Sequence, residues 1–145
     1  MGATWRDLGP ALELERACFG KDAWPWIDVL AALSLPGTVR LKAEAADRLI
    51  GLAVGERWSG HEQGWIASLA VHPDYQRRGI GRRLLEACEQ ALGTRRIRLT
   101  VRVSNRAAID LYRGSAYIPI EVWRRYYSDG EDAQVMEKER RGAGG

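Results

Sequence analysis

The residues best suited to chemistry form a short basic segment with two glycines, QRRGIG, from Gln76 to Gly81. A glycine-rich turn at a helix start directs unpaired backbone N–H groups and the positive end of the helix dipole to one place. Because arginines flank that place on both sides, the segment predicts a site for a phosphorylated ligand. The alternative is a loop whose arginines are merely solvated. The strand pattern before the segment and the helical pattern after it favour the ligand site.

Two regular elements must position this segment. Apolar, β-prone residues run up to Val71, and His72-Pro73-Asp74 then ends the run with turn chemistry. From Ile80 to Leu92, apolar residues recur at helical spacing with charged residues between them. The sequence therefore predicts a strand over 65–71, a tight loop and a helix over 80–92.

Further strands and helices are expected along the rest of the chain. The strands are predicted over 3–7, 38–45, 49–58, 97–103, 117–125 and 133–138. The helices are predicted over 8–18, 27–33 and 106–113. The resulting order, β-α-α-β-β-β-α-β-α-β-β, implies an α/β domain with a mixed sheet. A single domain over 1–140 and a short flexible tail over 141–145 account for the 145 residues.

The composition indicates a globular protein without a membrane segment or a dedicated metal site. Apolar residues make up 46% of the chain and charged residues 28%. No apolar run is long enough to cross a membrane and no leader is visible, so the cytoplasm is the expected location. Cys18 and Cys88 fall on separate predicted helices and are expected to be small buried side chains, and the two histidines complete no metal site. The net charge of +3 is modest, whereas a nucleic-acid binder would show a denser basic stripe.

Several stretches resemble one enzyme superfamily. QRRGIG resembles the pyrophosphate loop, Q/R-x-x-G-x-G/A, of the acetyl-CoA-dependent GNAT acetyltransferases, and it lacks the Gly-Lys-Ser/Thr ending of a Walker loop. The stretch from Val101 to Tyr112 is similar to the V-R-x-S-N-x-x-A-I-x-L-Y segment of N-terminal acetyltransferases. The stretch after Arg125, with Met136 beyond it, resembles the Y-Y-x-D-G-E-D-A-x-x-M segment of that subgroup, and Cys18-Phe19 and Pro25-Trp26 echo its early region more loosely. The nearest likeness is to the RimI-type ribosomal-protein alanine acetyltransferases and their archaeal relatives.

The resemblance implies a GNAT fold, in which a mixed, mostly antiparallel sheet has two splayed central strands and helices on both faces. It implies that acetyl-CoA lies in the splay, with its pantetheine arm paired to the backbone of the strand before the glycine segment. A backbone N–H there would also stabilise the thioester oxygen as it gains charge. No metal is implied. The cofactor-binding residues implied in this way are Leu69, Ala70, Val71, Gln76, Arg77, Arg78, Gly79, Ile80, Gly81, Arg82, Asn105 and Tyr112.

The implied reaction is direct attack of a protein N-terminal α-amine on acetyl-CoA within a ternary complex. A ribosomal protein, such as the N-terminal alanine of ribosomal protein S18, is the candidate target. Tyr112 would protonate the leaving CoA thiolate, because a phenol with a pKa of about 10 stays protonated at neutral pH. The alternative for Tyr112 is a core tyrosine on a helix face, and the tryptophans named next could equally cover the core. The peptide would be flanked by Trp24, Pro25, Trp26, Tyr126 and Tyr127.

The chain departs from the family pattern at the general base. Thr100 stands where the RimI-type enzymes have a glutamate, and Trp65 stands where some relatives have a histidine or tyrosine. Neither side chain can take a proton from an ammonium group at neutral pH. An α-amine with a pKa of about 7.7–8.0 is already roughly one-tenth neutral at pH 7, whereas fewer than about one lysine in a thousand is. A missing base therefore favours an α-amine as the substrate. A water and four residues stay open as bases by chemistry alone, namely Glu56, Glu121, His61 and His72.

Two other functions remain open on the same scaffold. One is acetylation of a small-molecule amine or a lysine, and the other is a non-catalytic acyl-CoA-binding module. A covalent acyl-enzyme is not expected, because no Cys or Ser lies in a nucleophile setting. Neither nucleic acid nor a membrane is expected as a partner.

Overall fold

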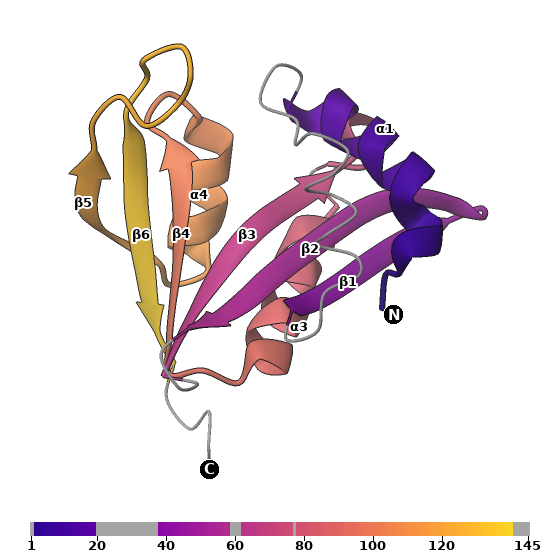
Figure 1. The fold of residues 1–145 in the computed structure, drawn as a ribbon, viewed down its shortest axis with the longest axis horizontal. Helices are drawn as coiled ribbons and strands as arrows, with labels where there is room; N and C mark the ends of the chain where they lie inside the picture. Colours follow the sequence, from indigo (N-terminus) through magenta and orange to yellow (C-terminus); the bar gives the residue numbers. More distant parts are fainter. Residues whose placement is uncertain (1, 20–37, 59–61, 77, 141–145) are drawn as a thin grey trace.

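A six-stranded sheet forms the frame of the molecule (Figure 1). The computed structural model describes residues 2–19, 38–58, 62–76 and 78–140. The strand order is β1-β2-β3-β4-β6-β5, and all neighbouring strands are antiparallel except β3 and β4, which are parallel. The predicted helix over 27–33 lies outside the described residues. The strands are β1 Thr38–Ala45, β2 Arg48–Trp58, β3 Gln63–Val71, β4 Arg96–Arg102, β5 Ile118–Trp123 and β6 Ala133–Glu139.

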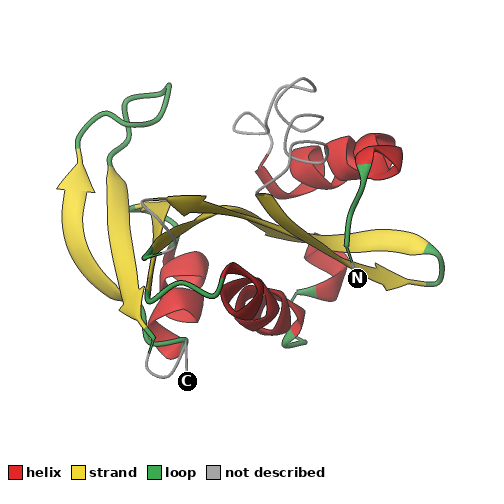
Figure 2. Cartoon of the chain, turned by 60° about the horizontal axis from the view of Figure 1, so that its bottom comes forward, coloured by secondary structure: helices red, strands yellow, loops and turns green. Residues whose placement is uncertain are grey.

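Helices cover both faces of the sheet, so the expected layered architecture is confirmed (Figure 2). Helix α1, Leu8–Phe19, packs on one face against β2 and β3. Helices α3, Ile80–Leu92, and α4, Arg106–Gly114, pack on the other. Helix α3 begins and ends where the sequence predicts, because Gly79 and Gly93 bound it with φ values of 80° and 64°. Such values cost glycine little and other residues more.

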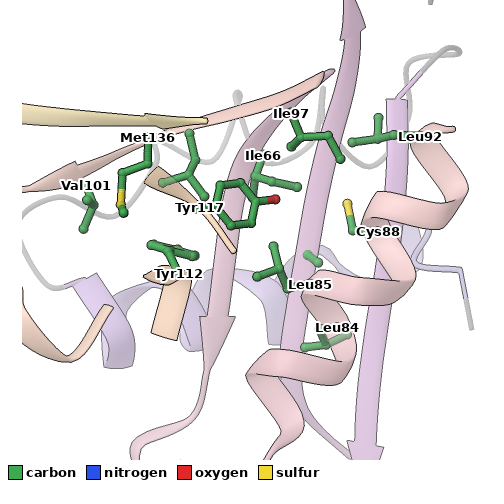
Figure 3. Packing of buried hydrophobic residues seen from close by; sticks show 12 residues of the cluster. Ile66, Leu84, Leu85, Cys88, Leu92, Ile97, Val101, Tyr112, Tyr117 and Met136 are labelled. Carbon is green, nitrogen blue, oxygen red and sulfur yellow. The ribbon is translucent and has the colours of Figure 1, made fainter. Parts of the chain in front are cut away.

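The larger core lies between the sheet and α3 and α4 (Figure 3). Burial along β4 alternates, with Ile97, Leu99 and Val101 facing this core. Because strand side chains alternate between the two faces, the intervening Arg98 and Thr100 face the opposite side. We call that opposite side the open face. A smaller cluster on it joins α1 to the β1–β3 part of the sheet through residues such as Ala3, Ala11, Leu14, Leu49, Leu52, Val54 and Ala70.

The predicted first strand over 3–7 is wrong. Residues Trp5–Asp7 form a 3-10 helix, and an isolated bridge between Gly2 and Leu41 joins this end of the chain to β1 in place of a regular strand. The Asp7 carboxylate accepts a hydrogen bond from the Thr4 N–H at 2.9 Å, and the Asp7 N–H donates to the Thr4 carbonyl at 2.8 Å. These local bonds favour a helical turn over an extended strand.

The two cysteines differ in burial. Cys88 on α3 is fully buried, as expected, whereas Cys18 on α1 is only half-buried. The Cys18 thiol donates to the carbonyl of Val71 at 3.2 Å and so ties α1 to the end of β3. Neither cysteine forms a disulfide.

Gly55 tests how closely β2 and α3 pack. A Cβ at this position would lie 2.9 Å from Cys88 Sγ and 3.0 Å from a methyl carbon of Leu92, both buried. We expect Gly55→Ala to lower the free energy of unfolding by about 1–3 kcal/mol, because the core must shift to admit the methyl group. Urea denaturation measures the change. The matched control is Gly9→Ala on α1, where a Cβ would meet nothing within 4 Å. Equal stabilities for the two variants would contradict the packing described.

Candidate active site

The two central strands part after three residue pairs. Residues 63–65 of β3 pair with residues 96–98 of β4, and the described chain contains no further pair between them. Beyond these pairs, β3 runs on to Val71 and β4 to Arg102, and the strands diverge (Figure 1). The expected splay is therefore confirmed. Backbone groups along the edges that face the gap have lost their strand partner, and a ligand can supply one.

The three β3 residues expected to meet the pantetheine arm lie along this gap. Leu69, Ala70 and Val71 pair with β2 on their other edge. The Val71 carbonyl accepts hydrogen bonds from the Gln76 side-chain amide at 3.0 Å and from the Cys18 thiol. Gln76 therefore fixes the direction in which the chain leaves β3 toward the glycine segment.

The glycine segment presents the N-terminus of α3 beside the splay. Gly79 is the N-cap, and no side chain caps the helix there. The first intrahelical bond runs from the Arg83 N–H to the Gly79 carbonyl at 3.1 Å. The preceding N–H groups of the first turn therefore stay available to an anion. A Cβ on Gly81 would lie 3.6 Å from side-chain carbons of Leu111 and Val71, which is an ordinary van der Waals contact. Close packing therefore does not require a glycine at this position.

The arginines around the helix start have different surroundings. Arg78 is exposed, and its guanidinium lies 5.1 Å from the centre of the Tyr75 ring, which holds it close to the glycine turn. Arg82 donates to the Gly114 carbonyl at 3.3 Å and pairs with Glu86 at 3.4 Å, so it also links α3 to the end of α4. Arg77 lies outside the described residues.

Asn105 is the N-cap of α4. Its side-chain oxygen accepts a hydrogen bond from the Ala108 N–H at 3.2 Å. Because the side-chain oxygen caps the helix, the hydrogen bond that Asn105 is expected to make to the cofactor would come from its NH₂ group. The cap sets the position of α4 and, with it, that of Tyr112 near the other end of this helix.

Tyr112 is 8% exposed and lies in the larger core with its ring edge against Tyr117, 5.8 Å between centroids (Figure 3). Burial, with a smaller contribution from Tyr127, raises the pKa of Tyr112 to about 12. The phenol therefore holds its proton throughout the physiological range. Tyr112 is therefore a core residue, and its role as proton donor to the leaving thiolate stays a prediction.

A buried polar group fixes the ring behind Tyr112. The Tyr117 hydroxyl donates to the carboxylate of Glu89 at 2.8 Å, and Lys138 lies 2.9 Å from the same carboxylate. Tyr117 and Glu89 are 2% and 3% exposed. Burial and the Glu89 carboxylate both raise the pKa of Tyr117 above its usual range. Glu89 is satisfied by two partners, so this charge on α3 anchors the helix to the start of β5 and to β6.

The loop between β5 and β6 is held over the end of β4 by Arg102. This arginine pairs with Asp129 at 2.9 Å and Glu131 at 2.6 Å, and its guanidinium lies 4.3 Å from the centre of the Tyr127 ring. Hydrogen bonds from Ser104 and Arg102 lower the pKa of Glu131. The sequence pattern suggested Tyr127 and the acidic turn but gave no sign that Arg102 organises them.

Five aromatic rings lie in one continuous row on the open face, and sequence reasoning missed it. Successive ring centroids are 5.1–5.8 Å apart. We call this set the aromatic row. Of the five, only Tyr126 and Tyr127 were predicted at the substrate site, and the predicted Trp24, Pro25 and Trp26 lie outside the described residues. The row consists of Trp58, Trp65, Trp123, Tyr126 and Tyr127.

The candidate bases within the described chain are engaged elsewhere. Both ring nitrogens of His72 have partners, since Nδ1 accepts from the Asp74 N–H at 3.1 Å and Nε2 lies 3.4 Å from Arg48. Glu56 accepts from the Trp58 indole at 3.2 Å, and Glu121 accepts from the Trp123 indole. His61 lies outside the described residues.

The described residues contain no cluster of three or more His, Cys, Asp or Glu side chains suited to a metal. Within the same ranges, every helix is too short or too polar to cross a membrane.

Comparison with known proteins places this geometry in a family. Residues 8–117 match the model of the acetyltransferase (GNAT) family. The chain is 38% identical over 137 residues to a ribosomal protein bS18 alanine N-acetyltransferase of Salmonella typhimurium, covering 90% of this chain and 89% of the relative. It is 42% identical over 79 residues to an N-alpha-acetyltransferase of Sulfurisphaera tokodaii, covering 52% of this chain and only 47% of that relative.

A solved structure agrees over nearly the whole length. The crystal structure of the ribosomal-protein-S18-alanine N-acetyltransferase from Escherichia coli matches with a TM-score of 0.85 at 28% identity, covering 96% of this chain and 91% of the other. The resemblance to the RimI-type enzymes is thereby confirmed. The chain belongs to the acetyltransferase (GNAT) family.

Proposed function

We propose that this protein transfers the acetyl group of acetyl-CoA to the N-terminal α-amine of a polypeptide. The observation that carries the proposal is the gap between β3 and β4, which opens beside the uncapped N-terminus of α3. One end of the gap offers backbone partners to an extended amide-containing chain, and the other offers N–H groups and arginines to a diphosphate. Acetyl-CoA has both parts in one molecule.

The chain's own residues divide the work along the gap. The N–H groups at the start of α3 and the Arg78 guanidinium bind the diphosphate, while Leu69 and Ala70 align the pantetheine arm. As the amine nitrogen bonds to the thioester carbonyl carbon and the C–S bond breaks, Tyr112 donates its proton to the departing thiolate sulfur. The proton that the amine nitrogen loses passes to water, and Tyr112 regains a proton from water. The raised pKa of Tyr112 ensures that the proton is present before the reaction.

An α-amine suits this site better than a lysine. Thr100 and Trp65 lie where the family places a base, and the candidate carboxylates of the described chain are bound to indoles. A substrate amine that is partly neutral at pH 7 needs little help in losing its proton. Relatives whose names specify N-terminal alanine or α-amine acetylation support the same choice. The proposed target is the N-terminus of a protein, with ribosomal proteins as the first candidates.

A panel of acceptors tests the proposal. Release of free CoA thiol is measured with acetyl-CoA and peptides beginning with Ala or Ser, the same peptides with a blocked N-terminus and an internal lysine, and polyamines. We expect turnover only where the α-amine is free. Turnover confined to lysines or polyamines would overturn the choice of acceptor, and tight acetyl-CoA binding without turnover on any amine would overturn catalysis.

Tyr112→Phe tests the proposed proton donor. General acid catalysis contributes about 10²–10⁴-fold, so we expect kcat to fall by at least about 100-fold. The KM for acetyl-CoA should change little, because the phenylalanine ring keeps the contact with Tyr117. The matched control is Tyr117→Phe, which removes a neighbouring hydroxyl and leaves the Glu89 carboxylate short of a donor. That variant should lose about 1–3 kcal/mol of stability but retain turnover. Equal turnover in the Tyr112 variant and the wild type would remove Tyr112 from the mechanism.

The pH dependence follows from the same assignments. The value of kcat/KM should rise with the fraction of neutral substrate amine, and Tyr112 should cause no fall until the pH nears its pKa of about 12. The measurement is initial rate against pH for two peptides whose amines differ in pKa, and the rising limb should move with the substrate. A limb fixed at one pH for both peptides would instead indicate a protein base. Because folding raises the pKa of Tyr112 above its ordinary value of 10.0, its contribution to stability is complete below pH 10 and is lost between pH 10 and 12.

A further inference from the structure

The aromatic row crosses the open face from β2 to the β5–β6 loop. Trp58 of β2 contacts Trp65 of β3 at 5.7 Å between centroids, and Trp65 contacts Trp123 of β5 at 5.8 Å. Tyr126 and Tyr127 continue the row at 5.5 Å and 5.1 Å. None of these rings belongs to either core cluster, so the row is a separate apolar surface.

Two rings of the row are exposed to solvent, and one polar atom within it has no hydrogen-bond partner in the described chain. Trp58 and Tyr126 are each 52% exposed. The indole N–H of Trp65 is buried and has no hydrogen-bond acceptor. Large exposed aromatic side chains in a continuous patch, together with a buried donor that lacks an acceptor, mark a surface that binds something.

The charges beside the row specify the sign of its ligand. Glu56 lies two residues from Trp58 and Glu121 two residues from Trp123, so each shares the open face with its tryptophan. Their only described partners are the neutral indoles, and no cation within the described chain pairs with either. By contrast, Arg98 pairs with Glu137 at 2.7 Å, and Arg102 pairs with Asp129 and Glu131 of the β5–β6 loop.

Two unneutralised carboxylates beside a row of π faces match a cationic ligand. Lysine and arginine bind to the faces of tryptophan and tyrosine, and carboxylates strengthen that attraction. The same carboxylates would repel the phosphates of a nucleic acid, although bases also stack on aromatic rings.

The row also meets the proposed reaction centre. Trp65 belongs to the last β3–β4 pair before the strands part, and Tyr127 is close enough to Tyr112 to help raise its pKa. Four centroid steps of 5.1–5.8 Å allow the row to accompany at most about six residues of extended chain, at about 3.3–3.6 Å per residue.

We propose that the aromatic row binds a lysine- or arginine-rich segment of the substrate polypeptide, a few residues beyond the acetylated amine. The proposal rests on the function proposed above and deepens it by naming the class of polypeptide preferred. Aromatic faces and the Glu56 and Glu121 carboxylates receive the basic side chains, and the Trp65 indole donates to a peptide carbonyl.

Three peptides test this preference on the wild-type protein. They share their first three residues, and their next five residues are rich in Lys and Arg, in Gln or in Glu. We expect the basic peptide to have a KM about 10-fold below that of the Gln peptide and the Glu peptide to have a higher one, with similar kcat values. Added salt should shrink the difference, because it screens exposed charges. Equal KM values for the basic and Gln peptides would overturn the proposal.

Two variants locate the effect. Trp58→Ala and Glu121→Gln should each reduce the KM ratio between the Gln and basic peptides several-fold, and a ratio cancels any loss of turnover common to both peptides. Val122→Ala is the apolar control, because Val122 is 48% exposed on the opposite face of β5. Asp47→Asn is the charge control, because Asp47 lies in the β1–β2 turn with φ 62°, where Asn is tolerated. An unchanged ratio in both test variants, or an equal reduction in the controls, would overturn the proposal.

A binding measurement separates the two proposals. Tryptophan fluorescence is titrated with the same three peptides in the presence of CoA. If no peptide is acetylated, the proposed function is overturned. Tighter binding of the basic peptide would still support the proposal that the aromatic row binds basic segments. If all peptides are acetylated and bind equally well, the proposal for the aromatic row is overturned and the proposed acetyltransferase function is supported.

Discussion

The parting of β3 and β4 is the constraint on which the rest of the structure depends. A parallel pair of strands normally satisfies its backbone groups by continuing side by side, and here pairing stops at Trp65 and Arg98. A 3-10 turn, Pro73–Tyr75, and the glycine segment connect the end of β3 to α3, so the gap and the helix start lie next to one another. Strand edges and helix N-terminus together make a surface that no single element could provide.

Contacts outside the sheet must stabilise the gap between β3 and β4, because no hydrogen bonds within the described residues join the two strands there. Helix α3 packs against β1, β2 and β3, and the buried Glu89 on the same helix is bonded to Tyr117 and Lys138 on the other side of the gap. The hydrogen bond from Arg82 to the Gly114 carbonyl joins α3 to the end of α4. The core therefore spans the two parts of the sheet even though the strands between them separate.

Local patterns in the sequence predicted the features that depend on neighbouring residues. The helix over 80–92 was predicted to the residue, because its glycines and its apolar spacing lie within one short segment. The strand over 3–7 was predicted wrongly, because hydrogen bonds between Thr4 and Asp7 form a helical turn in this short segment. The motif that contains Tyr112 predicted a role for it at the cofactor, whereas its burial depends on Tyr117 and α3 and carries no local signature.

The aromatic row escaped prediction for a different reason. Trp58 and Trp65 lie on the successive strands β2 and β3, but Trp123 lies far along the sequence on β5, and the contacts among the three depend on register and on which face each side chain takes. Arg102 likewise looks like part of a strand motif until the β5–β6 loop folds over it. Contacts between distant strands become predictable only after the order of the sheet is known.

Because the pairing between β3 and β4 is short, the sheet has two parts, β1–β3 and β4–β6, which few backbone hydrogen bonds join. A ligand bound between the two parts of the sheet contacts both of them and links them while it is bound. Occupancy and resistance to heat are then linked by mass action, since a ligand that prefers the native state stabilises it in proportion to the logarithm of its concentration above saturation. The ligand-free protein would unfold most easily and would be cleaved fastest by proteases. The concentration of the ligand would therefore affect the lifetime of the protein.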